Sequence, residues 1–148
     1  MGYPTYGPSN QQNAANYQKI KIETATPEAL ILMLYDGALR FMAQAEAAFE
    51  ENNIEKINNF LLRVQAIFTE LQCSLDREKG GDIAANLERL YIFFNNQLVE
   101  ANMKKDVNYL LAIKPMVQNL RDSWEVAMQK HQSTQKVVPP RPRLNLSA

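Results

Sequence analysis

The chain has 148 residues, the length of a single domain, and its 46% apolar and 22% charged residues are ordinary for a globular protein. Its 16 basic and 16 acidic side chains balance, but residues 129–148 carry four basic residues and no acidic one, which leaves 12 basic against 16 acidic residues elsewhere. Binding to nucleic acid needs a basic face that displaces counterions from phosphates. A body with a net charge near −4 therefore argues against a nucleic-acid partner.

Cysteine usage and the N-terminal sequence bear on the compartment. Cys73 is the only cysteine, so the chain cannot form an internal disulfide and suits a reducing compartment. Residues 1–16 have neither the basic segment nor the apolar run of a signal peptide. The longest apolar run, residues 29–35, is too short to cross a membrane. We therefore expect a cytoplasmic protein without membrane insertion.

In chain order, the first expected element is a flexible N-terminal arm over residues 1–25, which begins with a segment rich in Gly, Pro, Asn, Gln and Tyr. A first helix is predicted to start at Thr26, a capping residue, followed by Pro27 and the acidic Glu28 at the positive helix end. Its expected core-facing positions have the spacing of one helix face. They are Leu30, Leu34, Ala38, Phe41, Ala45 and Ala48.

A second helix is predicted to start near Asn52 or Asn53, and a third at Asp82 after the helix stop Gly80-Gly81. In the second helix, apolar residues recur at alternating steps of four and three, which is typical of helical bundles. These positions are Ile57, Leu61, Val64, Phe68, Leu71 and Leu75. The corresponding positions of the third helix are Ile83, Leu87, Leu90, Phe94, Leu98 and Ala101.

A fourth helix is predicted to start at Asp106, although Pro115 inside its pattern should kink or break it. Its expected core-facing positions are Leu110, Ile113, Val117, Leu120, Trp124 and Ala127. Residues 132–148 contain three prolines and two arginines, and we expect a disordered tail with some polyproline character. Short links make neighbouring helices antiparallel, so residues 26–131 are predicted to form an all-α, up-down four-helix bundle.

Catalytic and metal-binding patterns are absent from the sequence. His131 is the only histidine, whereas a di-iron bundle needs a Glu-x-x-His motif on each of two helices. Cys73 is expected to be a buried or half-buried small hydrophobe rather than a nucleophile. Neither a phosphate-binding loop nor a dinucleotide-binding glycine motif is present. We therefore expect a protein that binds another molecule and is not an enzyme, and that needs no cofactor or metal.

The helices carry more apolar surface than one core needs. Because a helix turns by about 100° per residue, Ile92 of the third helix points away from the core-facing positions of that helix. The same outer stripe holds Ala85, Asn96, Val99 and Met103. The first helix carries Leu32 and Leu39 behind its core-facing positions, and the second carries Leu62 and Ala66.

Three interpretations of these stripes stay open. They are ordinary core if a helix is buried all round or the bundle is twisted. Alternatively they form a groove for an amphipathic partner helix, because contiguous exposed apolar patches flanked by polar residues usually mark interaction sites. A third possibility is that one stripe closes a homodimer of a structural protein.

Several segments, taken together and in order, resemble the FliS family of flagellar secretion chaperones over about residues 17–130. The N-terminal part of the resemblance is Thr24-Ala25-Thr26-Pro27-Glu28 followed by Leu32-Met33-Leu34-Tyr35-Asp36-Gly37-Ala38-Leu39-Arg40-Phe41. Further matches are Leu71 to Asp76, Asn86-Leu87, Leu90-Tyr91, Leu98 to Asn102 and Leu120 to Trp124. Pro115 departs from the family's usual fourth helix.

The resemblance implies a four-helix bundle that binds the C-terminal segment of flagellin in the cytoplasm, prevents early polymerisation and delivers flagellin to the export apparatus. It also implies that an N-terminal segment folds over the bundle and is displaced by flagellin. Tyr17 and Ile22 fall at matching positions of that segment, and Ile20 stands where the family commonly has Asn. We expect a monomer or weak dimer. A chaperone or adaptor for another flagellar or secreted subunit remains the main alternative.

Overall fold

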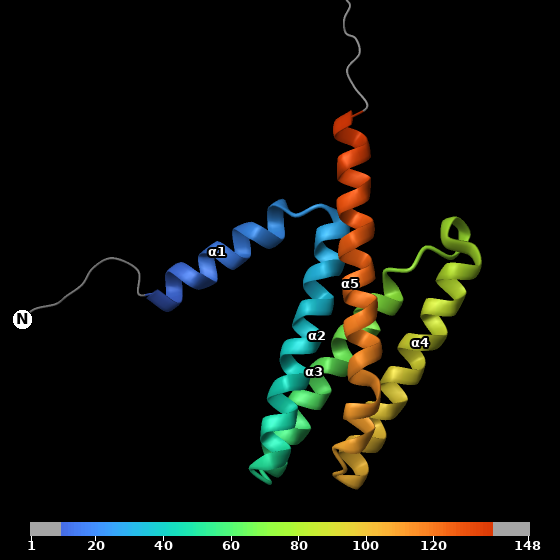
Figure 1. Cartoon of the computed structure of the whole chain (residues 1–148). Coiled ribbons are helices and arrows are strands. Elements are labelled where there is room, and N and C mark those ends of the chain that lie inside the picture. Colours follow the sequence, from blue (N-terminus) through green and yellow to red (C-terminus); the bar gives the residue numbers. More distant parts are fainter. Residues whose placement is uncertain (1–9, 138–148) are drawn as a thin grey trace, which may run out of the picture.

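A computed structural model describes residues 10–137 of the chain. This part of the chain consists of five helices and contains no strand (Figure 1). The helices are α1 (Asn10–Thr24), α2 (Pro27–Glu50), α3 (Ile54–Cys73), α4 (Arg77–Lys104) and α5 (Asn108–Val137). The predicted all-helical class is confirmed, with one helix more than the sequence pattern indicated.

The starts of α2 and α3 lie where the capping residues predicted them. The Thr26 hydroxyl accepts a hydrogen bond from the backbone N–H of Ala29 at 3.1 Å, and Pro27 occupies the first helical position. The Asn53 side chain accepts from the backbone N–H of Lys56 at 3.0 Å. Each side chain thereby satisfies one of the amide groups that a helix N-terminus leaves without a partner.

The start of α4 differs from the prediction. The Asp76 carboxylate caps the helix by accepting from the backbone N–H groups of Glu78 and Lys79, so α4 begins at Arg77 and not at Asp82. The expected interruption is nevertheless present at Gly81, whose φ of 52° and ψ of −128° are not helical. Glycine adopts positive φ at little cost, which is why the helix bends there.

The course of α5 also corrects an expectation. Asp106 accepts from the backbone N–H of Asn108 at 2.9 Å, and the helix begins at Asn108, two residues later than predicted. Pro115 lies inside α5 without ending it. The helix continues to Val137, so the first residues of the predicted disordered tail are helical. The Pro- and Arg-rich part of that tail lies outside the described residues.

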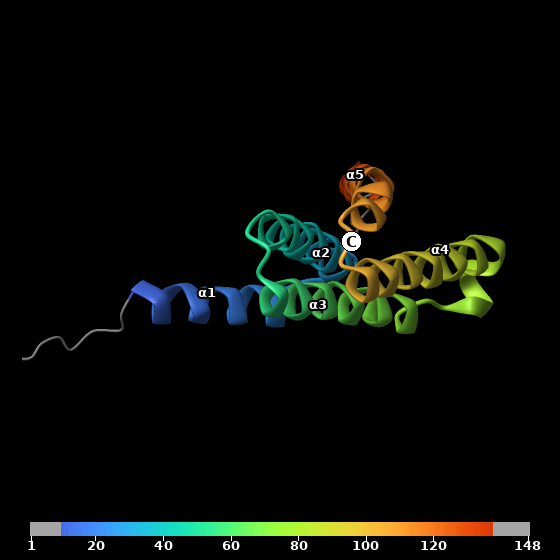
Figure 2. The same cartoon turned by 90° about the horizontal axis from the view of Figure 1, so that it is seen from below.

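The four long helices pack around a shared core. Helix α2 contacts α3 and α5, and α4 contacts the same two helices, so each of the four has two neighbours (Figure 2). Consecutive helices from α2 to α5 run in opposite directions (Figure 1). The largest fully buried side chains are Phe68, Phe94, Met42, Ile57, Leu61, Leu71, Leu98, Leu110, Ile113, Val64 and Val117.

The core-facing positions are most accurate for α3, where five of the six predicted residues are buried and Leu75 is half-buried against the core. In α2 and α4 the buried face is turned slightly: Tyr35 is buried in place of Leu34, and Met42 in place of Phe41. In α4, Ile83 is 72% exposed and the adjacent Ala84 is buried. In α5, Ala127 is exposed, although Trp124 one turn earlier is half-buried against the core.

Polar contacts fix α5 against α2. The Arg121 guanidinium donates to the Asp36 carboxylate at 2.8 Å and also pairs with Glu125 one turn along its own helix. The Trp124 indole N–H donates to the Glu28 backbone carbonyl at 2.8 Å. Trp124 is half-buried, so this bond joins its polar edge to the first turn of α2 while its ring packs against the core.

One polar pair lies inside the core. The hydroxyls of Tyr35 on α2 and Tyr91 on α4 are hydrogen-bonded at 2.6 Å. Burial raises the pKa of both phenols, so both hydroxyls stay neutral. The Tyr91 ring also stacks against Phe68 of α3, with 6.2 Å between ring centroids. The pair therefore joins three helices at one level of the core.

Tyr35→Phe is expected to destabilise the protein by about 1–3 kcal/mol, because it leaves the buried Tyr91 hydroxyl without a partner. Adding Tyr91→Phe should recover part of that loss, since removing both hydroxyls leaves no buried donor unpaired. Urea unfolding followed by circular dichroism measures both changes. Losses that simply add in the double variant would mean that the two hydroxyls do not depend on each other.

Helix α1 replaces the flexible arm that the composition suggested. All of its described side chains, residues 13–24, are exposed. The helix extends away from α2–α5 in both views (Figures 1 and 2). The helical structure of α1 corrects the expected irregular arm. Because α1 lies apart from the core, we expect that it does not stabilise the rest of the protein.

Candidate binding face on helices α3 and α4

Exposed apolar side chains gather on the adjacent helices α3 and α4. Leu62 on α3 is 49% exposed, and Ile92 and Val99 on α4 are 43% and 38% exposed. Ala66, one turn after Leu62, is exposed as well. We call these four residues the α3–α4 face. None of them belongs to the buried core, so the interpretation of Ile92 and Val99 as ordinary core is wrong.

Two side-chain hydrogen bonds between the helices locate this face. The Asn102 amide donates to the Asn58 side chain at 2.8 Å, and the Asn95 amide donates to the Thr69 hydroxyl at 3.3 Å. Side chains three or four residues apart lie on the same side of a helix. Because the two helices are antiparallel, these bonds bridge the surface at two levels and fix the register between α3 and α4.

Leu62, Ala66 and Val99 lie between the two bridges, and Ile92 lies about one turn before Asn95, just beyond the Asn95–Thr69 bond. Val99 is four residues after Asn95 and three before Asn102, so it lies on the side of α4 that faces α3. Leu62 is one turn beyond Asn58 on α3 and therefore lies at the level of Val99. The result is a polar-flanked apolar strip along two helices, a shape that suits the apolar face of an amphipathic helix.

The remaining predicted residues of α4 continue this strip toward solvent. Met103 and Asn96 are exposed, and Ala85 is half-buried near the start of the helix. All three point within about 40° of the direction opposite to Phe94, which faces the core. They form its outer edge.

The structure does not bring the α2 residues into the α3–α4 face. Leu39 packs against the core, and Leu32 is half-buried. Both lie on a different helix from the strip. Burial of this kind is what the ordinary-core interpretation of the first helix anticipated.

The three residues expected to dock the N-terminal arm all lie on α1. Tyr17, Ile20 and Ile22 are exposed in this structure. Their side chains are therefore accessible, and their docking over the bundle stays a prediction.

Sequence reasoning missed several exposed apolar residues, among them one on α4 and one on α5, and misjudged Cys73. Phe93 on α4 and Met116 on α5 are exposed, and helical geometry puts both on the sides where α4 and α5 face each other. The five consecutive apolar residues 90–94 were a usable signal, because such a run covers every side of a helix. Cys73 ends α3 and is exposed, not buried or half-buried as expected.

Two features are absent from the described residues. In this part of the chain, no three Cys, His, Asp or Glu side chains come together as metal ligands would. Nor is any helix among the described residues both long and apolar enough to cross a bilayer. The described residues thus form an all-helical protein with an exposed apolar strip along two adjacent helices.

Comparison with known proteins identifies the family. Residues 9–131 match the family model described as flagellar protein FliS, and the chain belongs to this family. It is 36% identical over 113 residues to the flagellar secretion chaperone FliS of Bacillus subtilis (strain 168), covering 76% of this chain and 84% of the relative. The FliS chaperone of Campylobacter jejuni is 37% identical over 112 residues, covering 76% and 86%. That of Vibrio cholerae is 32% identical over 113 residues, covering 74% and 83%.

These relatives are named as secretion chaperones and not as enzymes. The chain is thus a member of the flagellar secretion chaperone family. Membership also implies that its partner is a substrate of flagellar export.

Proposed function

We propose that this chain binds the C-terminal segment of flagellin in the cytoplasm, prevents its premature polymerisation and delivers it to the flagellar export apparatus. The observation that carries the proposal is the α3–α4 face, an exposed apolar strip along two helices whose register two side-chain hydrogen bonds fix. Family membership supplies the class of partner. The up-down four-helix bundle expected from the sequence, formed by α2–α5, is the scaffold in this proposal.

The physical argument concerns the surface that a carrier must cover. An amphipathic helix that assembles through its apolar face stays monomeric only while another apolar surface covers that face. Burial of apolar side chains contributes about 25 cal/mol per Å², so a strip along two helices supports useful affinity. A disordered segment also loses conformational entropy when it folds on binding, which keeps affinity moderate and permits later release.

Calorimetric titration of this protein with full-length monomeric flagellin and with flagellin lacking its C-terminal segment tests the proposal. Binding of the first and failure of the second is the expected result. A filament-cap subunit serves as the competing cargo, because another exported subunit is the main alternative. Preference for the cap subunit, or equal binding of the truncated flagellin, would exclude the proposed cargo segment.

Deletion of residues 1–24 tests the role of α1. Its described side chains are all exposed, so the deletion should leave the melting temperature of α2–α5 nearly unchanged. If Tyr17 and Ile22 compete with cargo for the same surface, removal of α1 should leave flagellin affinity equal or raise it. Calorimetry on the folded variant gives the answer. A loss of affinity of about tenfold or more, equivalent to about 1.4 kcal/mol, would show instead that α1 forms part of the cargo site.

A further inference from the structure

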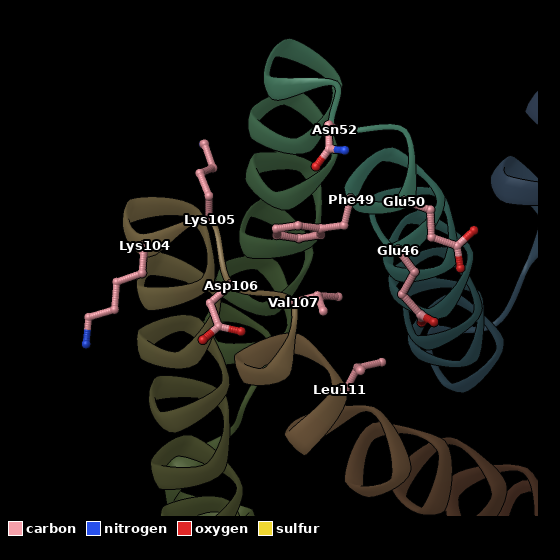
Figure 3. Close-up of a pocket in the computed structure, with 9 residues that line it drawn as sticks. All are labelled: Glu46, Phe49, Glu50, Asn52, Lys104, Lys105, Asp106, Val107 and Leu111. Atoms are coloured by element: carbon pink, nitrogen blue, oxygen red, sulfur yellow. The ribbon is translucent and has the colours of Figure 1, made fainter.

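A pocket of about 550 Å³ lies at the end of the protein where the α2–α3 and α4–α5 links meet (Figure 3). Its apolar residues are Phe49 on α2, Val107 in the α4–α5 link and Leu111 on α5. Leu111 is 41% exposed, so this apolar floor is open to solvent. None of these residues belongs to the α3–α4 face, and the proposed function makes no use of them.

Three acidic and two basic side chains line this pocket. Glu46 and Glu50 lie on α2, across the apolar floor from Asp106 (Figure 3). Glu46 pairs with Lys114 of α5 at 2.6 Å. Among the described residues no basic side chain pairs with Glu50 or Asp106, so two carboxylates remain without a cationic partner.

The two lysines of the pocket do not neutralise these carboxylates. Lys104 pairs with Glu100 at 2.9 Å and donates to the Tyr109 hydroxyl at 3.0 Å. Lys105 donates to the Asn102 side chain of α4. Both side chains point away from the space between α2 and α5 (Figure 3). The pocket therefore offers an apolar floor with unpaired negative charge, which suits a segment that combines apolar and basic side chains.

The chain itself carries such a segment. Residues 138–144 read Val-Pro-Pro-Arg-Pro-Arg-Leu, with two arginines, five apolar or proline residues and no acid. Proline restricts the backbone of the free segment, so less conformational entropy is lost when it binds. This segment lies outside the described residues, so only its position in the sequence and its composition support the proposal.

The tail cannot reach the pocket of its own chain. The pocket lies beside the start of α5, and Val137 is the last residue of this 30-residue helix, about 45 Å away. Arg143 is six residues beyond Val137 and can extend at most about 22 Å back along the helix. A contact between the tail and the pocket must therefore join two copies.

We propose that two copies form a weak antiparallel dimer in which the Pro- and Arg-rich segment of each, residues 138–144, occupies the acidic pocket of the other. Because the pocket and Val137, after which the tail begins, lie at opposite ends of α5, antiparallel copies side by side allow both contacts to form at once. The two contacts are identical, as a two-fold axis requires, and the second forms intramolecularly once the first has formed.

Sedimentation velocity on the full chain over a range of concentrations tests this dimer. We expect a monomer–dimer equilibrium that weakens as salt is added, because exposed ion pairs are screened. Glu50→Lys in the pocket, or Arg141→Glu with Arg143→Glu in the tail, should each raise the dissociation constant about tenfold by opposing like charges. Combining the pocket and tail changes should restore much of the affinity, since the charges are exchanged.

Glu70→Lys is the matched control, because Glu70 is an exposed acid on α3 outside the pocket and changes the net charge equally. It should leave the equilibrium unchanged. A chain that stays monomeric at high micromolar concentration in low salt overturns the proposal. So does a dimer that tolerates both charge reversals, because such a dimer would use another surface. Restoration by the combined variant supports the proposed pairing and is not expected from a general effect of net charge.

Discussion

Replacing Ile92 and Val99 together with Asp should weaken flagellin binding at least about a hundredfold while leaving the protein folded. Each side chain contributes about 1.5–3 kcal/mol when it moves from water into an apolar contact, and the new carboxylates would face the apolar side of the cargo helix. Neither residue belongs to the buried core. The change in stability should therefore be about 1 kcal/mol or less.

The control carries the same charge change elsewhere. Met116 and Val126 are exposed apolar residues on α5, and Met116→Asp with Val126→Asp should leave flagellin binding near its original value. Melting temperature and calorimetry on one sample of each variant separate the outcomes. Unfolding of the Ile92 and Val99 variant would show that the α3–α4 face supplies packing that the fold requires. Retained folding with retained binding would place the cargo site on other helices.

The sequence was most informative where one side of a helix alone is apolar. In α3, polar residues occupy most of the outer side, so the alternation of three- and four-residue steps identified every core position. In α2 and α4, apolar residues occur on several sides, and the pattern identified the buried residues toward the end of each helix but missed by one residue at several other positions. Tyr35 and Tyr91 are buried where the pattern predicted the adjacent Leu34 and Leu90.

Local signals competed at the start of α4. Gly80-Gly81 is a strong helix stop, and it drew the predicted start to Asp82, although Asp76 caps the helix five residues earlier. The structure contains both features, because the helix starts at Arg77 and is interrupted at Gly81. A capping carboxylate followed by one short turn is easily missed when a stronger break lies beside it.

The residues of the candidate face were found from helix periodicity, but their arrangement was not. The pairing of Asn95 with Thr69, and of Asn102 with Asn58, depends on the register between α3 and α4. Periodicity within one helix carries no information about that register, which the packing of the core sets. The sequence therefore predicted Leu62 and Val99 separately as members of a partner surface, and the structure shows that they lie at the same level.

Phe68→Ala is expected to destabilise the protein by about 3–5 kcal/mol, because Phe68 is fully buried and a cavity would replace its ring. The ring lies 5.1 Å from that of Phe94 and also stacks against Tyr91, so α3 and α4 would lose their principal aromatic contact. Leu62→Ala on the same helix removes an exposed side chain and should cost less than about 1 kcal/mol. For flagellin binding the order should be the opposite: Leu62→Ala should weaken binding more than Phe68→Ala, because Leu62 lies on the α3–α4 face. Urea unfolding and flagellin calorimetry on both variants check the pair. A large loss of stability from Leu62→Ala would place that side chain in the core, whereas full flagellin affinity in the folded variant would remove it from the cargo site.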